Sequence, residues 1–211
     1  MRRLPVYILI DTSGSMKGEP IEAVKVCLSD MFSTLKNDPY SLETVWVSVI
    51  TFNKEAQVLF PLTELDKIVV PKISVPDDGP THIGRALELL CNQYDAEVRN
   101  TNVEQKGDWR PLLFILTDGK PSDILHYNNM VEEVKLRKFG NIFACAAGMK
   151  AKKEPLLQLT SNVLESASID AGTFKQFFQY VSVTITEGGK SVQMTPDIDN
   201  PPEEIEIQLD F

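Results

Sequence analysis

The sequence predicts an α/β fold: a doubly wound, mostly parallel six-stranded sheet with one antiparallel edge strand and helices on both faces. Three observations support this fold class. Short apolar runs typical of strands alternate with segments whose apolar residues recur every three or four positions, as in helices. Several runs, such as VYILI, are apolar throughout, as in strands buried on both faces. One pair of strand-like runs is separated by a short turn and therefore predicts a hairpin.

Six segments of the chain are typical of strands. The first is expected at 6–10 and ends directly before Asp11. Residues 44–52 are rich in β-branched and aromatic side chains, and a turn connects them to a second strand-like run at 56–62. Pro61 lies within this run and favours an edge strand, because proline cannot donate a hydrogen bond to a neighbouring strand. The remaining strands are predicted at 111–118, 141–148 and 163–166.

Five segments are predicted as helices from the spacing of their apolar residues. The first covers about 18–37, and the second begins after a loop at 75–82. The others are expected at 123–138, 153–160 and 172–184. The residues expected on the inner faces are Ile21, Val24, Leu28, Met31 and Leu35 in the first helix, Ile83, Leu87, Leu90 and Tyr94 in the second, and Phe174, Phe177, Phe178 and Val181 in the last.

The composition limits the class of protein. The chain has 211 residues, 43% of them hydrophobic, which suits one globular domain. Its net charge of −9 would repel a phosphate backbone, so no nucleic acid is expected as a partner. Cys27, Cys91 and Cys145 form no C-x-x-C pair, and we expect them to be buried free thiols in a reducing compartment.

The two ends of the chain differ in character. The start, MRRLPVYILID, has no small-residue cleavage site after its apolar run, so we interpret it as the first strand rather than a signal peptide.

No segment approaches the roughly 20 apolar residues of a membrane span, and a cytoplasmic protein is expected. Residues 1–190 are predicted to form the α/β domain, and 191–211 an acidic tail with three prolines. The alternation in EIEIQLDF would suit a strand added to this protein or to a partner.

Two aspartates follow predicted buried strands at their carboxyl ends. Asp11 comes directly after the first strand, and Asp118 comes directly after PLLFILT. In an open α/β sheet, ligands bind beyond the carboxyl ends of the strands, where the strand order reverses. If these two strands are neighbours, both carboxylates converge, and they repel each other unless a cation lies between them.

Hydroxyl side chains accompany the two carboxylates. Ser13 and Ser15 alternate with Asp11, so the three side chains can point the same way. The loop DDGPTH supplies Thr81 at the start of the second long helix. Carboxylates, hydroxyls and water are ligands that Mg²⁺ accepts, and the same oxygen ligands suit Mn²⁺ or Ca²⁺. The sequence therefore predicts a site for a hard divalent cation.

This pattern resembles the metal-ion-dependent adhesion site (MIDAS) of von Willebrand factor A domains. The family motif is D-x-S-x-S, then a distant threonine and a distant aspartate. The five matching positions are Asp11, Ser13, Ser15, Thr81 and Asp118. The resemblance covers roughly residues 4–185 and implies a Rossmann-like fold. The small single-domain form and the FFQYVS stretch look like the bacterial TerY group, which is encoded with tellurite-resistance and stress genes.

The resemblance implies a metal-dependent adapter or scaffold domain and not an enzyme. The three hydroxyls would bind Mg²⁺ directly or nearly so, and the two aspartates would bind it directly or through water. An Asp or Glu side chain of a protein partner would complete the metal's coordination. For the TerY group, that partner would be a kinase or a phosphatase of the same system. The residues expected to contact the partner are Gly14, Met16, His82 and Gly119.

Other interpretations of these residues stay open. Ser13 and Ser15 also suit a helix cap and a turn, and Thr81 suits a helix N-cap. A haloacid-dehalogenase-type phosphatase needs an aspartate where this chain has Ser13, and the P-loop and G-x-S-x-G motifs are absent from the sequence. A metal-dependent phosphohydrolase is the alternative function. A third possibility is a cation that only braces the loops.

Overall fold

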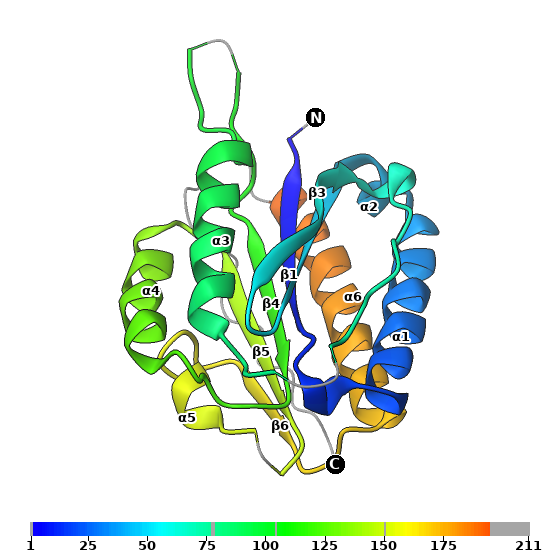
Figure 1. Ribbon diagram of the computed structural model, residues 1–211. Coiled ribbons are helices and arrows are strands. Elements are labelled where there is room, and N and C mark those ends of the chain that lie inside the picture. Colours follow the sequence, from blue (N-terminus) through cyan, green and yellow to red (C-terminus); the bar gives the residue numbers. More distant parts are fainter. Residues whose placement is uncertain (1, 77–78, 104, 150, 195–211) are drawn as a thin grey trace.

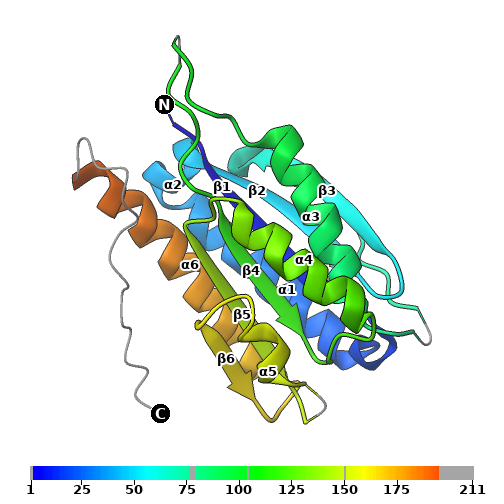
Figure 2. The same ribbon diagram turned by 90° about the vertical axis from the view of Figure 1, so that its left-hand side faces the viewer.

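The computed structural model describes residues 2–76, 79–103, 105–149 and 151–194, and the predicted acidic tail from 195 onward lies outside them. Six strands form one sheet in the order β3-β2-β1-β4-β5-β6, and only β3 runs antiparallel to its neighbour. Helices cover both faces of this sheet (Figures 1 and 2). The predicted α/β fold class, with one antiparallel edge strand, is confirmed.

The six predicted strands are all present, with small differences at their ends. The central strand β1 is buried along its whole length, which explains its unbroken apolar sequence. The predicted edge strand that contains Pro61 is β3, and it pairs with β2 as a hairpin. The bounds are β1 Leu4–Asp11, β2 Val45–Phe52, β3 Ala56–Glu64, β4 Leu112–Thr117, β5 Asn141–Ala147 and β6 Val163–Ser166.

The helices form two layers, with α1 packed against α6 on one face of the sheet and α3 against α4 on the other (Figure 2). The five predicted helices are present, together with α2, which was not predicted. Two short 3-10 segments lie at Gly14–Met16 and Leu65–Lys67. The bounds are α1 Glu19–Lys36, α2 Pro39–Thr44, α3 Ile83–Glu97, α4 Ile124–Leu136, α5 Lys153–Leu156 and α6 Ala171–Met194.

One helix was not predicted, and two predicted helices end at a different residue from the one expected. The helix α2 begins with Asp38 as its N-cap, whose side chain accepts a hydrogen bond of 2.9 Å from the backbone N–H of Ser41. The helix α5 ends at Leu156 and not at 160, because the chain continues as turns. The helix α6 continues to Met194 beyond the predicted end at 184. None of the described helices is both long and apolar enough to cross a bilayer.

The alternation of side chains along β1 builds two separate cores. Val6, Ile8 and Ile10 pack on the side of α1 and α6, whereas Tyr7 and Leu9 pack on the side of α3 and α4. The predicted inner-face residues of α6 are all buried in the first core: Phe174, Phe177, Phe178 and Val181. The three cysteines are buried and unbridged, as predicted.

The strand order reverses between β1 and β4. From β1 the chain builds outward through β2 to β3, and from β4 it builds in the opposite direction through β5 to β6. The two strands are parallel neighbours, with Ile10 opposite Leu116. Their carboxyl ends therefore form the switch point at which α/β folds bind ligands. Asp11 and Asp118 both lie at this point, as the sequence led us to expect.

The helices α3 and α4 come very close together at Gly84, in the first turn of α3. A Cβ atom added at Gly84 would lie 2.6 Å from the backbone N of Tyr127 and 2.7 Å from Oδ2 of Asp123. The backbone N of Tyr127 belongs to the first turn of α4, so it cannot move without shifting that helix. The absence of a side chain at Gly84 thus sets the distance between the two helices beside the switch point.

Replacing Gly84 by alanine is expected to lower the free energy of unfolding by about 1–3 kcal/mol, because the added methyl group forces α3 and α4 apart. Urea denaturation followed by circular dichroism measures this change. The matched control is Gly79→Ala, where the nearest atom to the new Cβ is Cγ of Pro76 at 3.9 Å. A Gly84→Ala protein that is as stable as wild type would contradict the claim that α3 and α4 lie too close together for a side chain at this position.

Candidate metal centre

The loop after β1 and the end of β4 bring two carboxylates and two serine hydroxyls together. Asp11 is fully buried, and Asp118 is 2% exposed. Ser13 lies between the other groups, because its Oγ donates a hydrogen bond of 3.4 Å to Oδ1 of Asp118 and lies 3.3 Å from Oγ of Ser15. Ser13 is itself buried, whereas Ser15 is exposed at the surface. The D-x-S-x-S loop thus meets Asp118, as predicted.

Both carboxylate oxygens of Asp11 accept hydrogen bonds that fix its orientation. The backbone N–H of Ser13 donates to Oδ1 at 2.7 Å, and the hydroxyl of Thr117 donates to Oδ2 at 2.6 Å. Burial and then the negative charge of Asp118 raise the pKa of Asp11 to about 6, although these hydrogen bonds act in the opposite direction. The repulsion expected from the sequence is therefore present in the fold.

A third loop brings Thr81 to the same place. Thr81 is 7% exposed, and its backbone O accepts a hydrogen bond of 2.9 Å from the N–H of Ser122. A Cβ atom added at Gly119 would lie only 2.8 Å from Oγ1 of Thr81. The hydroxyl of Thr81 therefore rests against the backbone of the residue that follows Asp118, and all five predicted ligands lie in one cluster.

Thr81 lies just before α3, and the first turn of α3 is held in place by the N-cap residue of α4. His82 is the N-cap residue but makes no capping hydrogen bond with its side chain. Instead, the carboxylate of Asp123 accepts hydrogen bonds from the N–H groups of Gly84 at 3.3 Å and Arg85 at 3.1 Å. This contact joins the β4–α4 loop to α3 across the site, so Thr81 and Asp118 are positioned by the same helix pair.

The cluster opens into a pocket of about 410 Å³. Two of its lining residues, Thr81 and Asp118, are predicted ligands that are otherwise buried, so solvent and small ions reach the site from this side. The full lining is Ser15, Gly79, Pro80, Thr81, Asp118, Gly119, Lys120, Ser122 and Lys152. The five clustered side chains offer only oxygen atoms, and their chemistry fits a hard divalent cation.

This cluster contains only two carboxylates and is otherwise made of hydroxyl groups. In the described part of the chain, no group of three or more His, Cys, Asp or Glu side chains is placed to bind a metal.

The four residues predicted to contact a partner lie in different environments. Gly14, His82 and Gly119 are half-buried beside the site. The ring Nδ1 of His82 lies 2.9 Å from the backbone O of Lys54. Met16 is fully buried in the core on the α1 side, so its predicted contact with a partner is wrong, and its side chain packs inside the protein.

Two residues with clear roles in the cluster were not predicted. Thr117 looked like the last core residue of β4, but its hydroxyl donates to Asp11 and also accepts a hydrogen bond of 3.2 Å from the N–H of Gly119. Asp123 holds the start of α3, which is far from it in sequence. The one signal in the sequence was that Thr117 directly precedes Asp118, which places a hydroxyl next to the predicted metal-binding residues.

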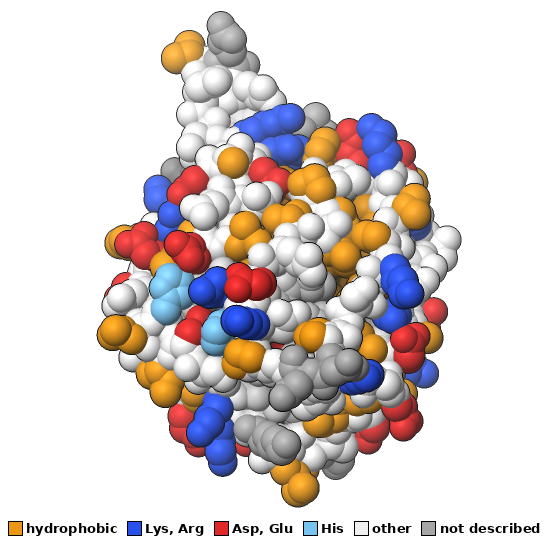
Figure 3. Space-filling model, viewed as in Figure 1, with side chains coloured by type: hydrophobic (Ala, Val, Ile, Leu, Met, Phe, Trp, Pro, Cys, Tyr) orange, Lys and Arg blue, Asp and Glu red, His pale blue; other side chains and the backbone are white. Residues whose placement is uncertain are grey.

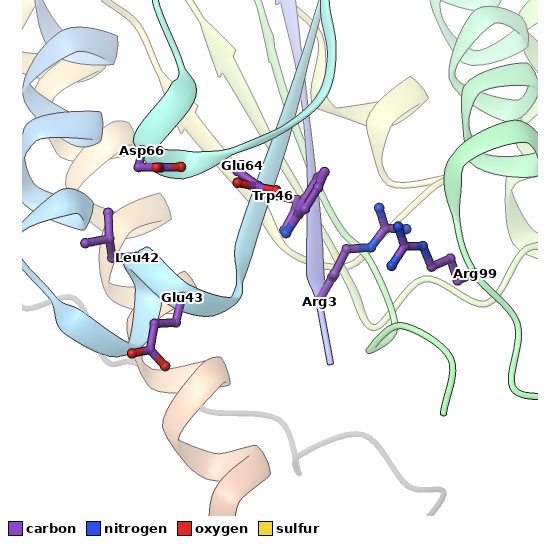
Figure 4. Close-up of a pocket in the computed structure, with 7 residues that line it drawn as sticks. All are labelled: Arg3, Leu42, Glu43, Trp46, Glu64, Asp66 and Arg99. Carbon is purple, nitrogen blue, oxygen red and sulfur yellow. The ribbon is translucent and has the colours of Figure 1, made fainter. Parts of the chain in front are cut away.

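A larger hollow, of about 510 Å³, lies at the other end of the sheet and has a different character (Figure 4). Arg3 points into it beside Trp46 and Arg99 (Figure 4). The guanidinium of Arg3 is already held by Asp108 through hydrogen bonds of 2.9 and 2.6 Å, and it lies 4.8 Å from the ring centre of Trp46. These contacts anchor the start of β1, and none of the five predicted ligands lines this hollow.

A family model for the von Willebrand factor type A domain matches residues 6–187 of this chain. Matrilin-3 of Gallus gallus is 31% identical to the chain over 127 residues, which cover 58% of this chain and 27% of matrilin-3. The chain therefore spans about a quarter of the length of this relative.

Solved structures with the same fold include proteins of very different sequence. Proximal thread matrix protein 1 from the mussel byssus, solved with zinc in its MIDAS motif, is 19% identical with a TM-score of 0.57, over 90% of this chain and 46% of that one. The pilus adhesin SpaC of Lactobacillus rhamnosus GG is 14% identical with a TM-score of 0.67, over 88% of this chain and 31% of that one. At these identities, the likeness shows the fold.

Replacing Gly119 by alanine is expected to weaken divalent-cation binding about 10-fold or more, because the new methyl group displaces the hydroxyl of Thr81. Calorimetric titration with Mn²⁺ measures the affinity. Gly79→Ala, in the same pocket, is the control and should bind like wild type. Equal affinity of the Gly119→Ala protein and wild type would show that Thr81 is not a ligand.

The metal-free protein is expected to lose stability as the pH rises from about 4 to about 6. The raised pKa of Asp11 means that the unfolded chain ionises first, so the folded state is penalised progressively over this range and fully above it. The difference between the pKa of about 6 in the folded protein and the ordinary value of 3.8 lowers the free energy of unfolding by about 3 kcal/mol. Chelated wild type and Asp11→Asn, compared by urea denaturation at pH 4.5 and 7.5, isolate this contribution. The same pH dependence in both proteins would contradict it.

Proposed function

The chain belongs to the von Willebrand factor type A domain family, and from this premise we propose that it is a protein-binding domain that docks a partner's carboxylate on a divalent cation. The cation would be held by the cluster at the switch point of the sheet. Its proposed ligands, directly or through water, are Asp11, Ser13, Ser15, Thr81 and Asp118.

The position of the Ser13 hydroxyl is the observation that carries this proposal. Its Oγ lies 3.3 Å from the hydroxyl of Ser15 and 3.4 Å from the carboxylate of Asp118, so oxygen atoms from two separate loops already converge. Hydroxyl ligands carry no charge, and a cation bound mainly by them keeps most of its positive charge. Such a cation attracts one further anionic ligand, and the pocket beside Thr81 and Asp118 gives a partner access to it.

We propose Mg²⁺ as the cation, with Mn²⁺ or Ca²⁺ as substitutes that the same oxygen ligands accept. Burial and then the charge of Asp118 raise the pKa of Asp11, and a cation at this place would offset the repulsion between the two carboxylates. Metal binding and folding are then linked, because a cation that binds only the folded chain stabilises it by about 2.7 kcal/mol at 100 times its Kd.

The lining of the pocket favours binding over hydrolysis. A metal-dependent phosphohydrolase needs a general base within reach of the attacking water. Among the described lining residues, Asp118 is the only carboxylate, and none is a histidine. Asp118 is already assigned to the cation, so the phosphohydrolase alternative lacks its proton acceptor in the described pocket.

The cellular setting follows from the sequence resemblance alone. On that basis we propose a cytoplasmic role in a bacterial tellurite-resistance or stress-response system, with a kinase or a phosphatase of the same system as the partner. The identity of a protein captured through the cation would test this setting separately from the metal site.

Ser13→Ala is expected to lower the affinity for Mn²⁺ at least 10-fold, because the hydroxyl that links Ser15 and Asp118 is lost. The matched control is Ser33→Ala, an exposed serine of α1 whose hydroxyl bonds to the backbone of its own helix. Calorimetric titration of both variants gives the affinities, and circular dichroism confirms that they are folded. Binding by Ser13→Ala that equals wild type would contradict the proposed ligand set.

Partner docking is tested with wild type and Asp118→Ala as baits in a native lysate, each with Mg²⁺ and with a chelator. The proposal predicts a protein that is retained only by wild type with Mg²⁺. Retention that ignores both the substitution and the chelator would show that the cation does not mediate docking. Turnover of generic phosphoesters by wild type, lost in Asp11→Ala, would establish the phosphohydrolase alternative instead.

A further inference from the structure

Two lysines at the rim of the metal pocket point to the kind of partner that it fits. We propose that Lys120 and Lys152 form a second anchor, which binds further carboxylates of a partner segment whose first carboxylate is on the cation. The partner would thus present a cluster of acidic residues and not a single one. This inference rests on the proposed metal site and goes beyond it, because neither lysine is a metal ligand.

The charge of the pocket differs from that of the whole chain. The chain carries a net charge of −9, yet the two lysines are the only cationic residues among the described pocket lining, and Asp118 is the only acidic one. On the face of the molecule shown in Figure 3, by contrast, acidic and basic side chains are intermixed. With the cation bound, the pocket becomes a local positive region on an acidic protein, which would attract an acidic segment.

The two ammonium groups are available to a partner. Both lysines are exposed, and neither forms an ion pair with any residue that the structure describes. Two other cationic side chains near this end of the sheet are already paired: Lys153 lies 2.9 Å from Glu165, and Arg85 lies 2.6 Å from Glu55. Lys152 and Lys153 are neighbours in the sequence, yet only Lys153 forms an ion pair among the described residues.

The lysines also define where the partner segment lies. Lys120 belongs to the loop after β4 and Lys152 to the loop after β5, and these two strands are adjacent in the sheet. Apart from Ser15 and the residues at 79–81, the whole pocket lining comes from these two loops. Met149, which is 88% exposed, lies in the second loop and offers an apolar contact. The segment would therefore extend from the cation over the β4 and β5 loops.

The test compares Lys120→Gln/Lys152→Gln with a control of equal charge, Lys106→Gln/Lys138→Gln, whose lysines are exposed and follow the far ends of α3 and α4. The probes are two synthetic peptides, one with a single glutamate between glycines and serines and one with three adjacent glutamates. Titrations in Mg²⁺ at about 20 mM salt, followed by two-dimensional NMR of the labelled full chain, give each Kd. Calorimetry with Mn²⁺ checks the metal site of each variant.

We expect wild type to bind the three-glutamate peptide more tightly than the single-glutamate peptide. The pocket variant should lose about 5- to 10-fold in affinity for the three-glutamate peptide, and this loss should shrink at about 0.5 M salt. The control should stay within about twofold of wild type, since its lysines lie away from the pocket. Both variants should bind Mn²⁺ at least as tightly as wild type, because removing nearby positive charge does not weaken a cation site.

The outcomes separate this inference from the proposed function. Equal affinity of the pocket variant and wild type for the three-glutamate peptide, with binding still abolished by a chelator, would overturn the second anchor and leave the metal site in place. The same loss in the control variant would also overturn it, because the effect would then be one of net charge. Peptide binding that is absent from wild type in Mg²⁺, or that ignores the chelator, would overturn the metal-dependent docking and the second anchor together.

Discussion

The repulsion between two buried carboxylates is the constraint around which this end of the molecule is built. The parallel pairing of β1 with β4 places Asp11 and Asp118 at adjacent strand ends, where burial leaves little water to screen their charges. Hydrogen bonds from Ser13 and Thr117 hold Asp11 but do not offset burial and the charge of Asp118, which together keep its pKa raised. A divalent cation among the surrounding hydroxyls would supply the missing positive charge, which is why we place the function here.

The helices on the α3 side convert this local arrangement into a positioned site. The close approach at Gly84 and the two hydrogen bonds to Asp123 fix the start of α3 relative to α4. Thr81 precedes one of these helices and Gly119 precedes the other, and they meet with no room for a Cβ atom at Gly119. A shift of either helix would therefore alter the distance between the Thr81 hydroxyl and Asp118, and packing far from the site would affect the affinity for the cation.

The sequence was sufficient where one physical signal dominated. Continuous apolar runs identified strands buried on both faces, and the five spaced oxygen-bearing residues identified the cluster. It was insufficient where the outcome depended on contacts between distant segments, as for Asp123 at the start of α3 and for Met16, which packs in the core. The short α2 carried an overlooked local signal, since Asp38 followed by Pro39 suits a helix N-cap and first turn. The extent of α6 was underestimated, because the helix continues past the predicted end at 184 and through Gly188 and Gly189, although glycine disfavours a helix interior.

The central claim is that one divalent cation binds among the oxygen atoms at the ends of β1 and β4. Anomalous diffraction from crystals of the protein grown with Mn²⁺ tests it most directly, because the signal locates the metal independently of any assumed ligand. The account predicts a single strong peak within about 2–2.5 Å of oxygen atoms from Ser13 and Ser15, with Asp118 and Thr81 directly or through water. A Mn²⁺ peak at another place with none in this cluster, or no peak at all at saturating Mn²⁺, would contradict it.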